Sequence, residues 1–262
     1  MRSAVAGKEH AKGLDVSSEQ ILITNGVSEA LDMVISSIVE DGDEILLPGP
    51  YYPPYASYVR LHGAKPIEFA VDLESGIPDI DDIRSKISSK TVAICLITPN
   101  NPTGLIFNQN SLQQLVDVAN EYNLYIICDE IYDQIVFDDK FTGIGSVAKD
   151  SPVILLNGFS KVHLMTGWRI GYIAFNSSSK LDPIRENLPK LARVRISSSL
   201  PVQHAALESI TGPQNYVSEF VFSTFLFLPH PSLVARLLLR YTWTRRHIEV
   251  QGHWQTDPQL RC

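Results

Sequence analysis

Three short runs constrain the fold of this chain most, because each is apolar at nearly every position. They lie at residues 91–98, 124–128 and 153–156. A strand with one solvated face alternates apolar and polar side chains, whereas a strand covered on both faces does not. The runs therefore predict central strands of a parallel sheet that has helices on both sides.

The segments between these runs supply the helices that such a sheet needs. Residues 111–122, for example, place Leu112, Leu115 and Ala119 on one helical face. Residues 1–14 are typical of the end of a helix closed by Gly13. Alternating strands and helices predict an α/β domain with a mostly parallel sheet. The other expected strands are 21–24, 44–47, 66–71 and 169–175, and the other expected helices are 29–39, 56–61, 79–87, 181–192 and 201–211.

Charge and cysteine content narrow the class of partner and the compartment. The 262 residues carry a net charge of −7, which does not favour a nucleic-acid partner. Cys95 and Cys128 lie inside apolar runs and indicate buried thiols, not a disulfide, as in a reducing compartment. No signal-peptide core is present at the N-terminus, and no apolar stretch before residue 219 is long enough to cross a membrane. We therefore expect a cytoplasmic protein without a membrane partner.

Polar residues and glycines follow four predicted strands at the edge where the carboxyl ends of parallel strands meet. Taken singly, each group has an ordinary interpretation as a turn, a helix cap or a solvated lysine. Together they favour a ligand site. The groups are Gly26, Val27 and Ser28 after strand 21–24, Asn101 after 91–98, Asp129 after 124–128, and Lys161 after 153–156.

The chemistry of these groups fits an anionic aromatic cofactor that reacts with an amine. Backbone N–H groups of Val27 and Ser28 open a helix and can bind a phosphate, with which Arg169 can pair. Asp129 can hold a proton on a ring nitrogen, and Lys161 can supply the reactive amine. Further contacts expected to the ring are hydrogen bonds from Asn101 and Tyr132 and stacking by an aromatic residue of the loop 51–55. No Cys, His or acidic spacing suggests a metal site.

Six motifs of this chain resemble those of class I/II aminotransferases, in that family's order and spacing, over about residues 15–212. The resemblance implies the three-layer α/β/α large domain of fold type I, with pyridoxal 5'-phosphate as cofactor. The alanine aminotransferase-like branch is the most similar, although aspartate-preferring enzymes have similar stretches. The motifs are Thr-Asn-Gly-Val-Ser-Glu-Ala (24–30), Pro-Gly-Pro-Tyr-Tyr-Pro-Pro-Tyr (48–55), Pro-Asn-Asn-Pro-Thr-Gly (99–104), Asp-Glu-Ile-Tyr (129–132), Asn-Gly-Phe-Ser-Lys (157–161) and Thr-Gly-Trp-Arg-Ile-Gly-Tyr (166–172).

The resemblance also implies roles for individual residues. Lys161, Asp129 and Tyr132 are expected to be catalytic, with Lys161 bonding to the cofactor and then moving a proton. Tyr52, in preference to Tyr51, is expected to stack on the ring. Many relatives carry a phosphate-binding serine three residues before the lysine, and Ser160 is expected to replace it in part, since that position is a glycine here. The implied substrates are an L-amino acid, alanine, aspartate or similar, and a 2-oxo acid such as 2-oxoglutarate, bound by a homodimer.

The last part of the chain departs from the family pattern. Residues 1–219 carry ten Lys, seven Arg and 27 acidic residues, whereas residues 220–262 carry no Lys, five Arg and two acidic residues. We expect a large domain at 1–212 and an atypical tail at 213–262, either a frameshift product or a divergent end. The family's N-terminal segment and its C-terminal small domain, with the arginine that binds the substrate carboxylate, are expected to be missing.

Two alternatives to an active aminotransferase therefore stay open. One is a fragment that binds the cofactor but is catalytically impaired. The other is a C–S lyase or decarboxylase of the same fold, since residues that contact the cofactor ring do not set the reaction type.

Overall fold

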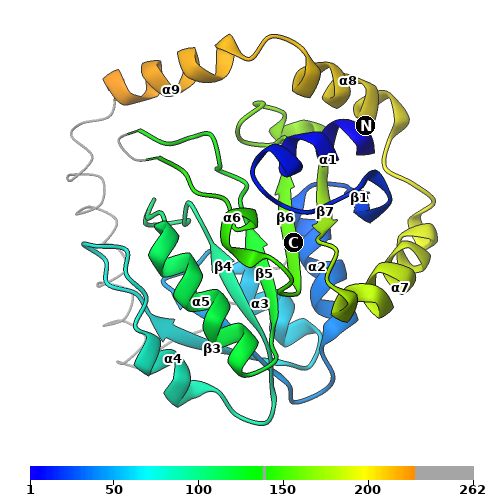
Figure 1. The fold of residues 1–262 in the computed structure, drawn as a ribbon. Coiled ribbons are helices and arrows are strands. Elements are labelled where there is room, and N and C mark those ends of the chain that lie inside the picture. The colour runs from blue at the N-terminus through cyan, green and yellow to red at the C-terminus, as the bar shows by residue number, and fades with distance from the viewer. Residues whose placement is uncertain (138–139, 228–262) are drawn as a thin grey trace, which may run out of the picture. The chain divides into compact units, whose positions relative to one another are not determined.

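A seven-stranded sheet forms the centre of the computed structural model, which describes residues 1–137 and 140–227 (Figure 1). The strand order is β1-β7-β6-β5-β4-β2-β3. Met1–Phe222 form one compact unit that contains the whole sheet, and Ser223–Cys262 form a second unit. The strands are β1 (Ile21–Thr24), β2 (Glu44–Gly49), β3 (Lys65–Ala70), β4 (Thr91–Ile97), β5 (Tyr125–Asp129), β6 (Val153–Gly158) and β7 (Gly171–Phe175).

Helices cover both faces of this sheet and bury a separate apolar cluster on each. In β5, for example, Ile126 and Cys128 belong to one cluster and Ile127 to the other. The three-layer α/β/α fold expected from the apolar runs is therefore confirmed. One face is covered by α1 (Arg2–Ala11), α4 (Ile80–Lys86), α5 (Gln109–Glu121), α6 (Gly145–Ala148) and α8 (Leu200–Thr211), and the other by α2 (Val27–Ile38), α3 (Pro54–Leu61) and α7 (Asp182–Ala192). The shorter 3-10 turns are η1 (Ser18–Gln20), η2 (Thr166–Trp168), η3 (Ser179–Leu181) and η4 (Arg193–Arg195).

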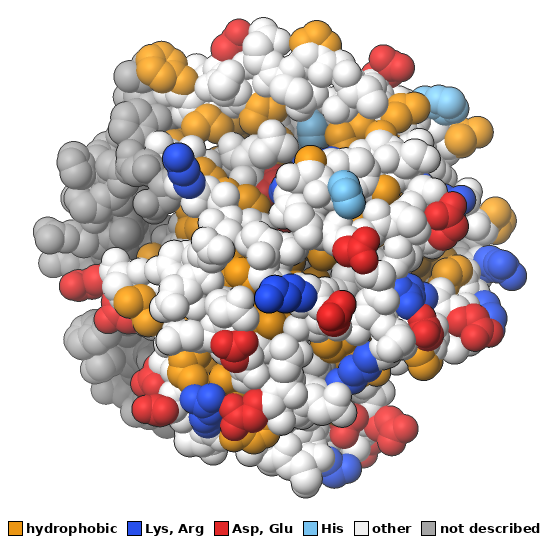
Figure 2. Space-filling model, in the orientation of Figure 1, with side chains coloured by type: hydrophobic (Ala, Val, Ile, Leu, Met, Phe, Trp, Pro, Cys, Tyr) orange, Lys and Arg blue, Asp and Glu red, His pale blue; other side chains and the backbone are white. Residues whose placement is uncertain are grey.

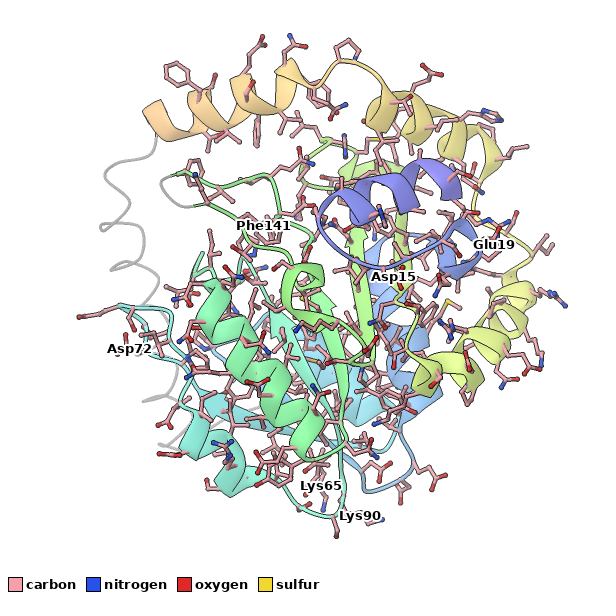
Figure 3. The ribbon with its side chains drawn as sticks, viewed as in Figure 1. Asp15, Glu19, Lys65, Asp72, Lys90 and Phe141 are labelled. Carbon is pink, nitrogen blue, oxygen red and sulfur yellow. The ribbon has the colours of Figure 1, made fainter. Side chains whose placement is uncertain are left out.

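The directions of the strands decide which residues meet at one edge. The five strands from β6 to β3 are parallel, whereas β7 is antiparallel to both of its neighbours, β6 and β1. The carboxyl ends of β1, β4, β5 and β6 therefore lie at the same edge as the amino end of β7. Figure 3 shows Lys65 and Lys90, which lie at the start of β3 and just before β4, at the opposite edge.

Several elements begin or end at other residues than expected, and α6 was not expected at all; β7, for example, begins at Gly171, so Arg169 lies outside the strand expected at 169–175. Helix α2 begins at Val27, two residues earlier than expected, because Gly26 ends the preceding turn with φ +85°. The expected tail begins with a helix, α9 (Asn215–Phe227), that the sequence analysis did not predict. A helix closes its backbone hydrogen bonds whichever side chains it carries, so it needs no apolar periodicity to form. The rest of the expected tail, residues 228–262, lies outside the described residues.

Two further observations concern the apolar content of single helices and the distribution of charge on one face of the molecule. No helix in the described ranges has the length and apolar composition needed to span a membrane. On the face shown in Figure 2, basic and acidic side chains are interspersed.

Candidate active site

A pocket of about 310 Å³ lies at the edge where the four strand ends meet. Nine of the ten residues expected to bind the cofactor line it, and the tenth, Gly26, lies against Arg169. Four separate segments of the chain are thus brought together as the spacing predicted. The nine are Val27, Ser28, Tyr52, Asn101, Asp129, Tyr132, Ser160, Lys161 and Arg169.

One wall of the pocket is the N-terminus of α2, where the backbone passes very close to its neighbours. Gly26 is the N-cap of α2 and provides no side-chain cap. A Cβ atom on Gly26 would lie 2.4 Å from Nη2 of Arg169, and one on Gly171 would lie 2.9 Å from the backbone nitrogen of Val27. Because both positions are glycine, the first N–H groups of α2 and the guanidinium of Arg169 can lie close together. Several N–H donors in one place suit the binding of an anion.

Arg169 reaches this wall because the chain turns sharply just before β7. Its backbone is left-handed, with φ +52°. Its Nη1 donates to the carbonyl oxygen of Thr166 at 3.0 Å, and the Thr166 hydroxyl donates to the carbonyl oxygen of Ser160 at 2.6 Å. The loop that carries Lys161 and the guanidinium of Arg169 are therefore coupled through Thr166, a pocket residue that the sequence analysis missed.

Asp129 lines the pocket from the end of β5, and both of its carboxylate oxygens accept hydrogen bonds. The Tyr55 hydroxyl donates to Oδ2 and the backbone N–H of Ile131 donates to Oδ1 at 2.9 Å. Burial raises the pKa of Asp129 to about 6, although these hydrogen bonds act to lower it. Tyr55 was missed as a contact of Asp129. Its place in the aromatic loop 51–55 was the only signal in the sequence, and the expected role of that loop was to stack on the ring.

The other residues expected to contact a cofactor ring also line the pocket. Lys161 Nζ lies 5.7 Å from the centre of the Tyr132 ring. Tyr132 is half-buried, and burial raises the pKa of its hydroxyl, with the charge of Asp129 adding to the effect. Tyr52 is 44% exposed at the rim, whereas Tyr51 packs against an apolar cluster. This placement agrees with the choice of Tyr52 for stacking on a ring, a role that stays a prediction.

The structure also explains why a glycine stands three residues before Lys161. A Cβ on Gly158 would lie 3.0 Å from both the Cα of Gly171 and the carbonyl oxygen of Ile170. A serine there would require β7 to shift away. Ser160, which lines the pocket, is the nearby hydroxyl that remains.

The functional groups of these residues have the chemistry that binding of pyridoxal phosphate requires. The glycine-lined N-terminus of α2, together with Arg169, offers N–H groups that would bind a phosphate. A single buried carboxylate, Asp129, stands where it can hold a ring proton, and one amine, Lys161, opens into the same pocket. Such an arrangement is typical of pyridoxal-phosphate enzymes with an α/β fold.

Comparison with known proteins agrees with this class. The family described as "Aminotransferase class I and II" matches residues 1–225. The chain belongs to this family, whose members depend on pyridoxal phosphate. The resemblance inferred from the motifs is therefore confirmed.

Named relatives include alanine aminotransferases and an aspartate aminotransferase. Glutamate-pyruvate aminotransferase AlaA of Escherichia coli is 38% identical over 224 residues, which are 84% of this chain and 55% of that protein. Among solved structures, an alanine aminotransferase from Pyrococcus furiosus is 42% identical, with a TM-score of 0.81 over 84% of this chain and 57% of that one. Thermus thermophilus aspartate aminotransferase with maleate is 30% identical, with a TM-score of 0.77 over 85% of this chain and 57% of that one. The chain spans about half the length of the curated relatives it matches.

Proposed function

We propose that this chain forms the cofactor-binding part of a pyridoxal-phosphate-dependent aminotransferase. The observation that carries the proposal is the single pocket into which Lys161, Asp129 and the N-terminus of α2 open together. When bound, the cofactor supplies a ring that accepts electrons from the substrate α-carbon. Asp129 holds a proton at the ring nitrogen, Arg169 and Ser28 bind the phosphate, and Lys161 Nζ moves a proton to and from the α-carbon.

The proposed reaction exchanges amino and keto groups between an L-amino acid and a 2-oxo acid. Alanine, aspartate or a similar amino acid is the proposed donor, and 2-oxoglutarate is a proposed acceptor. The printed names of the relatives support this choice, since they include glutamate-pyruvate, alanine and probable aspartate aminotransferases.

A homodimer in the cytoplasm is the proposed state of the complete enzyme. Three exposed apolar side chains between α7 and the first residue of α8 support a second copy as partner: Val194, Ile196 and Leu200 are 84%, 88% and 64% exposed. Arg195 already binds within its own chain, 2.6 Å from Glu29 and with a hydrogen bond to the Ile23 carbonyl. The buried free thiols of Cys95 and Cys128 support a reducing compartment.

A catalytically impaired cofactor-binding fragment is the second candidate. The observation in its favour is that the family match ends at residue 225, whereas the chain continues to residue 262. Cofactor binding and turnover must therefore be tested separately.

Cofactor binding is tested by purifying the chain with pyridoxal phosphate and recording its visible absorption. We expect an absorption band that Lys161→Ala abolishes, because the lysine amine bonds to the cofactor. Lys90→Ala, at the opposite edge of the sheet, should keep the band. A band that survives loss of Lys161, or no band in the wild-type chain, would contradict the proposed site.

Turnover is tested by adding alanine, aspartate or glutamate, each without an acceptor, to the loaded chain. A change in the visible band with any of them supports an active aminotransferase. A band that no amino acid changes supports the impaired fragment.

A further inference from the structure

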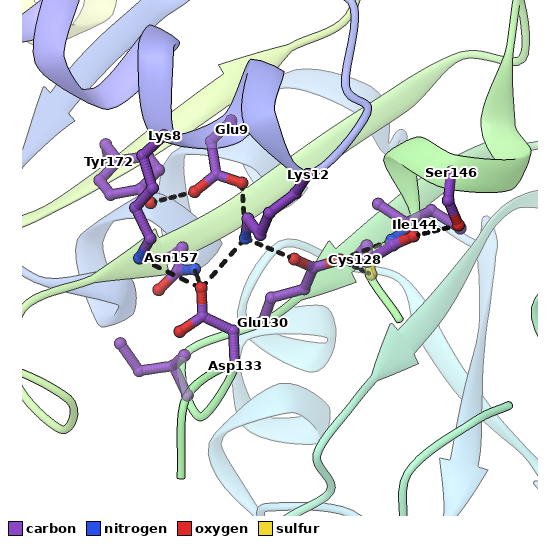
Figure 4. A network of polar contacts seen from close by, with 12 residues as sticks. Lys8, Glu9, Lys12, Cys128, Glu130, Asp133, Ile144, Ser146, Asn157 and Tyr172 are labelled. Atoms are coloured by element: carbon purple, nitrogen blue, oxygen red, sulfur yellow. Dashed lines mark hydrogen bonds and ion pairs between the residues drawn. The ribbon is translucent and has the colours of Figure 1, made fainter. Parts of the chain in front are cut away.

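A buried network of charges joins α1 to the strand ends behind the pocket (Figure 4). Its centre is Lys12, the C-cap residue that directly follows α1. Lys12 Nζ lies 2.6 Å from Oε2 of Glu9, 2.8 Å from Oε2 of Glu130 and 3.0 Å from Oδ2 of Asp133. All three carboxylates are almost fully buried. Lys12 is not among the residues that line the pocket.

Two members of the network flank the pocket residues in the chain. Glu130 directly follows Asp129, and Asp133 directly follows Tyr132. The other oxygen of Glu130, Oε1, accepts the backbone N–H of Ile144 at 2.7 Å. The segment 129–133, which carries Asp129 and Tyr132 on its pocket side, is thus held from behind by Lys12.

Asn157 extends the same network to the strand that leads to Lys161. Its Nδ2 donates to Oδ2 of Asp133 at 3.0 Å, and its Oδ1 accepts the backbone N–H of Gly158 at 2.7 Å. Lys8 adds a second ammonium group, 3.1 Å from the same Asp133 oxygen. One carboxylate oxygen therefore receives contacts from α1 and from the end of β6.

Within the network, neighbouring charges outweigh the effect of burial on the pKa values of Lys12 and Asp133. Burial lowers the pKa of Lys12, but the nearby carboxylates of Glu130, Glu9 and Asp133 more than reverse this effect, so that the pKa lies well above its usual value. Burial likewise raises the pKa of Asp133, yet Lys8 and Lys12 outweigh it and hold that pKa below its usual value. The negative charge of Asp133 acts to raise the pKa of Asp129. Lys12 thereby offsets a charge that acts on the pocket.

Other groups face these residues from the surrounding elements. The Tyr172 hydroxyl in β7 donates to Oε1 of Glu9 at 2.5 Å, and the charge of Asp133 also acts on His163. The ring centre of Phe141, labelled in Figure 3, lies 5.8 Å from Lys12 Nζ. Asp129 itself is faced by Tyr55 and by the charge of Lys161.

Packing of α1 does not by itself account for these ion pairs. Val5 is fully buried and Ala6 nearly so, and both anchor the helix in an apolar cluster. Ion pairs inside a protein bring a large desolvation cost, and replacing them by apolar groups often leaves stability unchanged. Their position directly behind the pocket favours a role in arranging it.

We propose that Lys12 is a positioning residue for the cofactor pocket, and that its ammonium group holds the segment Glu130–Asp133 and thereby Asp129 and Tyr132. The part of this inference that concerns the cofactor rests on the proposed function. Lys12 acts through Glu130 and Asp133 and touches neither cofactor nor substrate.

The test compares Lys12→Met with Val5→Ala, which loosens the same helix without changing charge. The first readout is the pKa of Asp129 in the unliganded chain, from carbon-13 NMR of labelled aspartate assigned with Asp129→Asn. The second is the affinity for pyridoxal phosphate. For Lys12→Met we expect a rise of about one unit in this pKa and about tenfold weaker cofactor binding. Val5→Ala should lower the melting temperature and leave both readouts as in the wild type.

A second substitution tests whether charge is the cause. Lys12→Met removes one positive charge, and adding Glu130→Gln removes one negative charge next to it. The double variant should therefore return the Asp129 pKa towards the wild-type value. If Lys12→Met does not fold, Lys8→Met, which removes one contact to Asp133, should raise the same pKa by a smaller amount. An unchanged Asp129 pKa in the folded Lys12→Met chain, or in Lys8→Met where Lys12→Met does not fold, would overturn the proposal.

The failure of this inference is distinguishable from failure of the proposed function. If the wild-type chain does not bind pyridoxal phosphate, the proposed function is wrong. The NMR comparison in the unliganded chain still decides whether Lys12 acts on Asp129.

Discussion

At the scale of single residues, the burial of Asp129 favours the binding of a cation beside its carboxylate. It is almost fully buried, which disfavours its charged form, yet Tyr55 and Ile131 direct hydrogen bonds at its two oxygens. The first effect dominates, since the pKa rises to about 6. A protonated ring nitrogen beside Asp129 would reverse this balance. Binding of such a cation is therefore favoured by the same burial that destabilises the carboxylate alone.

The pH dependence of stability follows from this shifted pKa. Because the pKa of Asp129 is higher in the folded chain than in the unfolded one, its contribution to stability is present below about pH 4. It is lost as the pH rises through about 6. Without cofactor, the free energy of unfolding of the wild type, relative to Asp129→Asn, should fall by about 3 kcal/mol across this window. Urea unfolding of both chains at several pH values measures it.

An aspartate whose pKa is lowered, not raised, in the folded chain supplies the control for this measurement. Asp72 (Figure 3) is exposed, and hydrogen bonds from Ser75, together with the backbone N–H of Glu74, lower its pKa. Its contribution is lost only as the pH falls below about 4, so the difference between wild type and Asp72→Asn should stay nearly constant from pH 4 to 6. A flat difference for Asp129→Asn over the same range would show that Asp129 is not the titrating group.

The contacts of Asp129 also show what the sequence can predict at this scale. Its position was predictable, because it ends an apolar run whose carboxyl end had to meet the others at one edge. The hydrogen bond from Tyr55 was not, since the two residues are 74 positions apart and meet only through the packing of α3. The bond from Lys12 to Glu130 spans 118 positions and was missed for the same reason.

At the scale of elements, the reversed direction of β7 is what brings Arg169 to the pocket. If β7 ran parallel to β6, Arg169 would lie at the far edge of the sheet. The sequence predicted both the strand and the role of Arg169. It did not predict the reversal, because an apolar run has no signature of direction. The left-handed turn at Arg169 is likewise unmarked, since no glycine or asparagine stands there.

The close packing of the N-terminus of α2 against Arg169 and the start of β7 gives a prediction at the scale of elements. Gly26→Ala places a methyl group against the guanidinium of Arg169 in a left-handed backbone. We expect about 1 kcal/mol lower stability from backbone strain and at least about tenfold weaker binding of pyridoxal phosphate as Arg169 is displaced. Urea unfolding and a fluorescence titration with the cofactor measure the two effects.

Gly42 provides a matched control for this substitution. It has the same φ of +85°, and a Cβ there would meet nothing within 4 Å. Gly42→Ala should therefore lower stability by a similar amount and leave cofactor affinity unchanged. Equal losses of affinity in the two variants would mean that strain, and not the contact with Arg169, is responsible.

At the scale of the whole molecule, two independent boundaries fall close together. The composition of the chain changes near residue 219, since residues 220–262 carry only two acidic residues, against 27 in residues 1–219, and no lysine follows Lys190. The match to the aminotransferase family ends at residue 225. A domain boundary inside the family would change neither the composition so sharply nor the family to which the sequence belongs. Both boundaries are instead expected where a reading frame changes.

The nucleotide sequence around codon 219 tests this expectation directly. If the frame changes there, another frame should continue with family-like sequence, including an arginine in the context that binds a substrate carboxylate. Adding that continuation to residues 1–219 should leave the Lys161-dependent absorption band in place and raise turnover, because closure of a second domain would add binding energy for the substrate. No family-like sequence in any of the three frames would favour the divergent end instead.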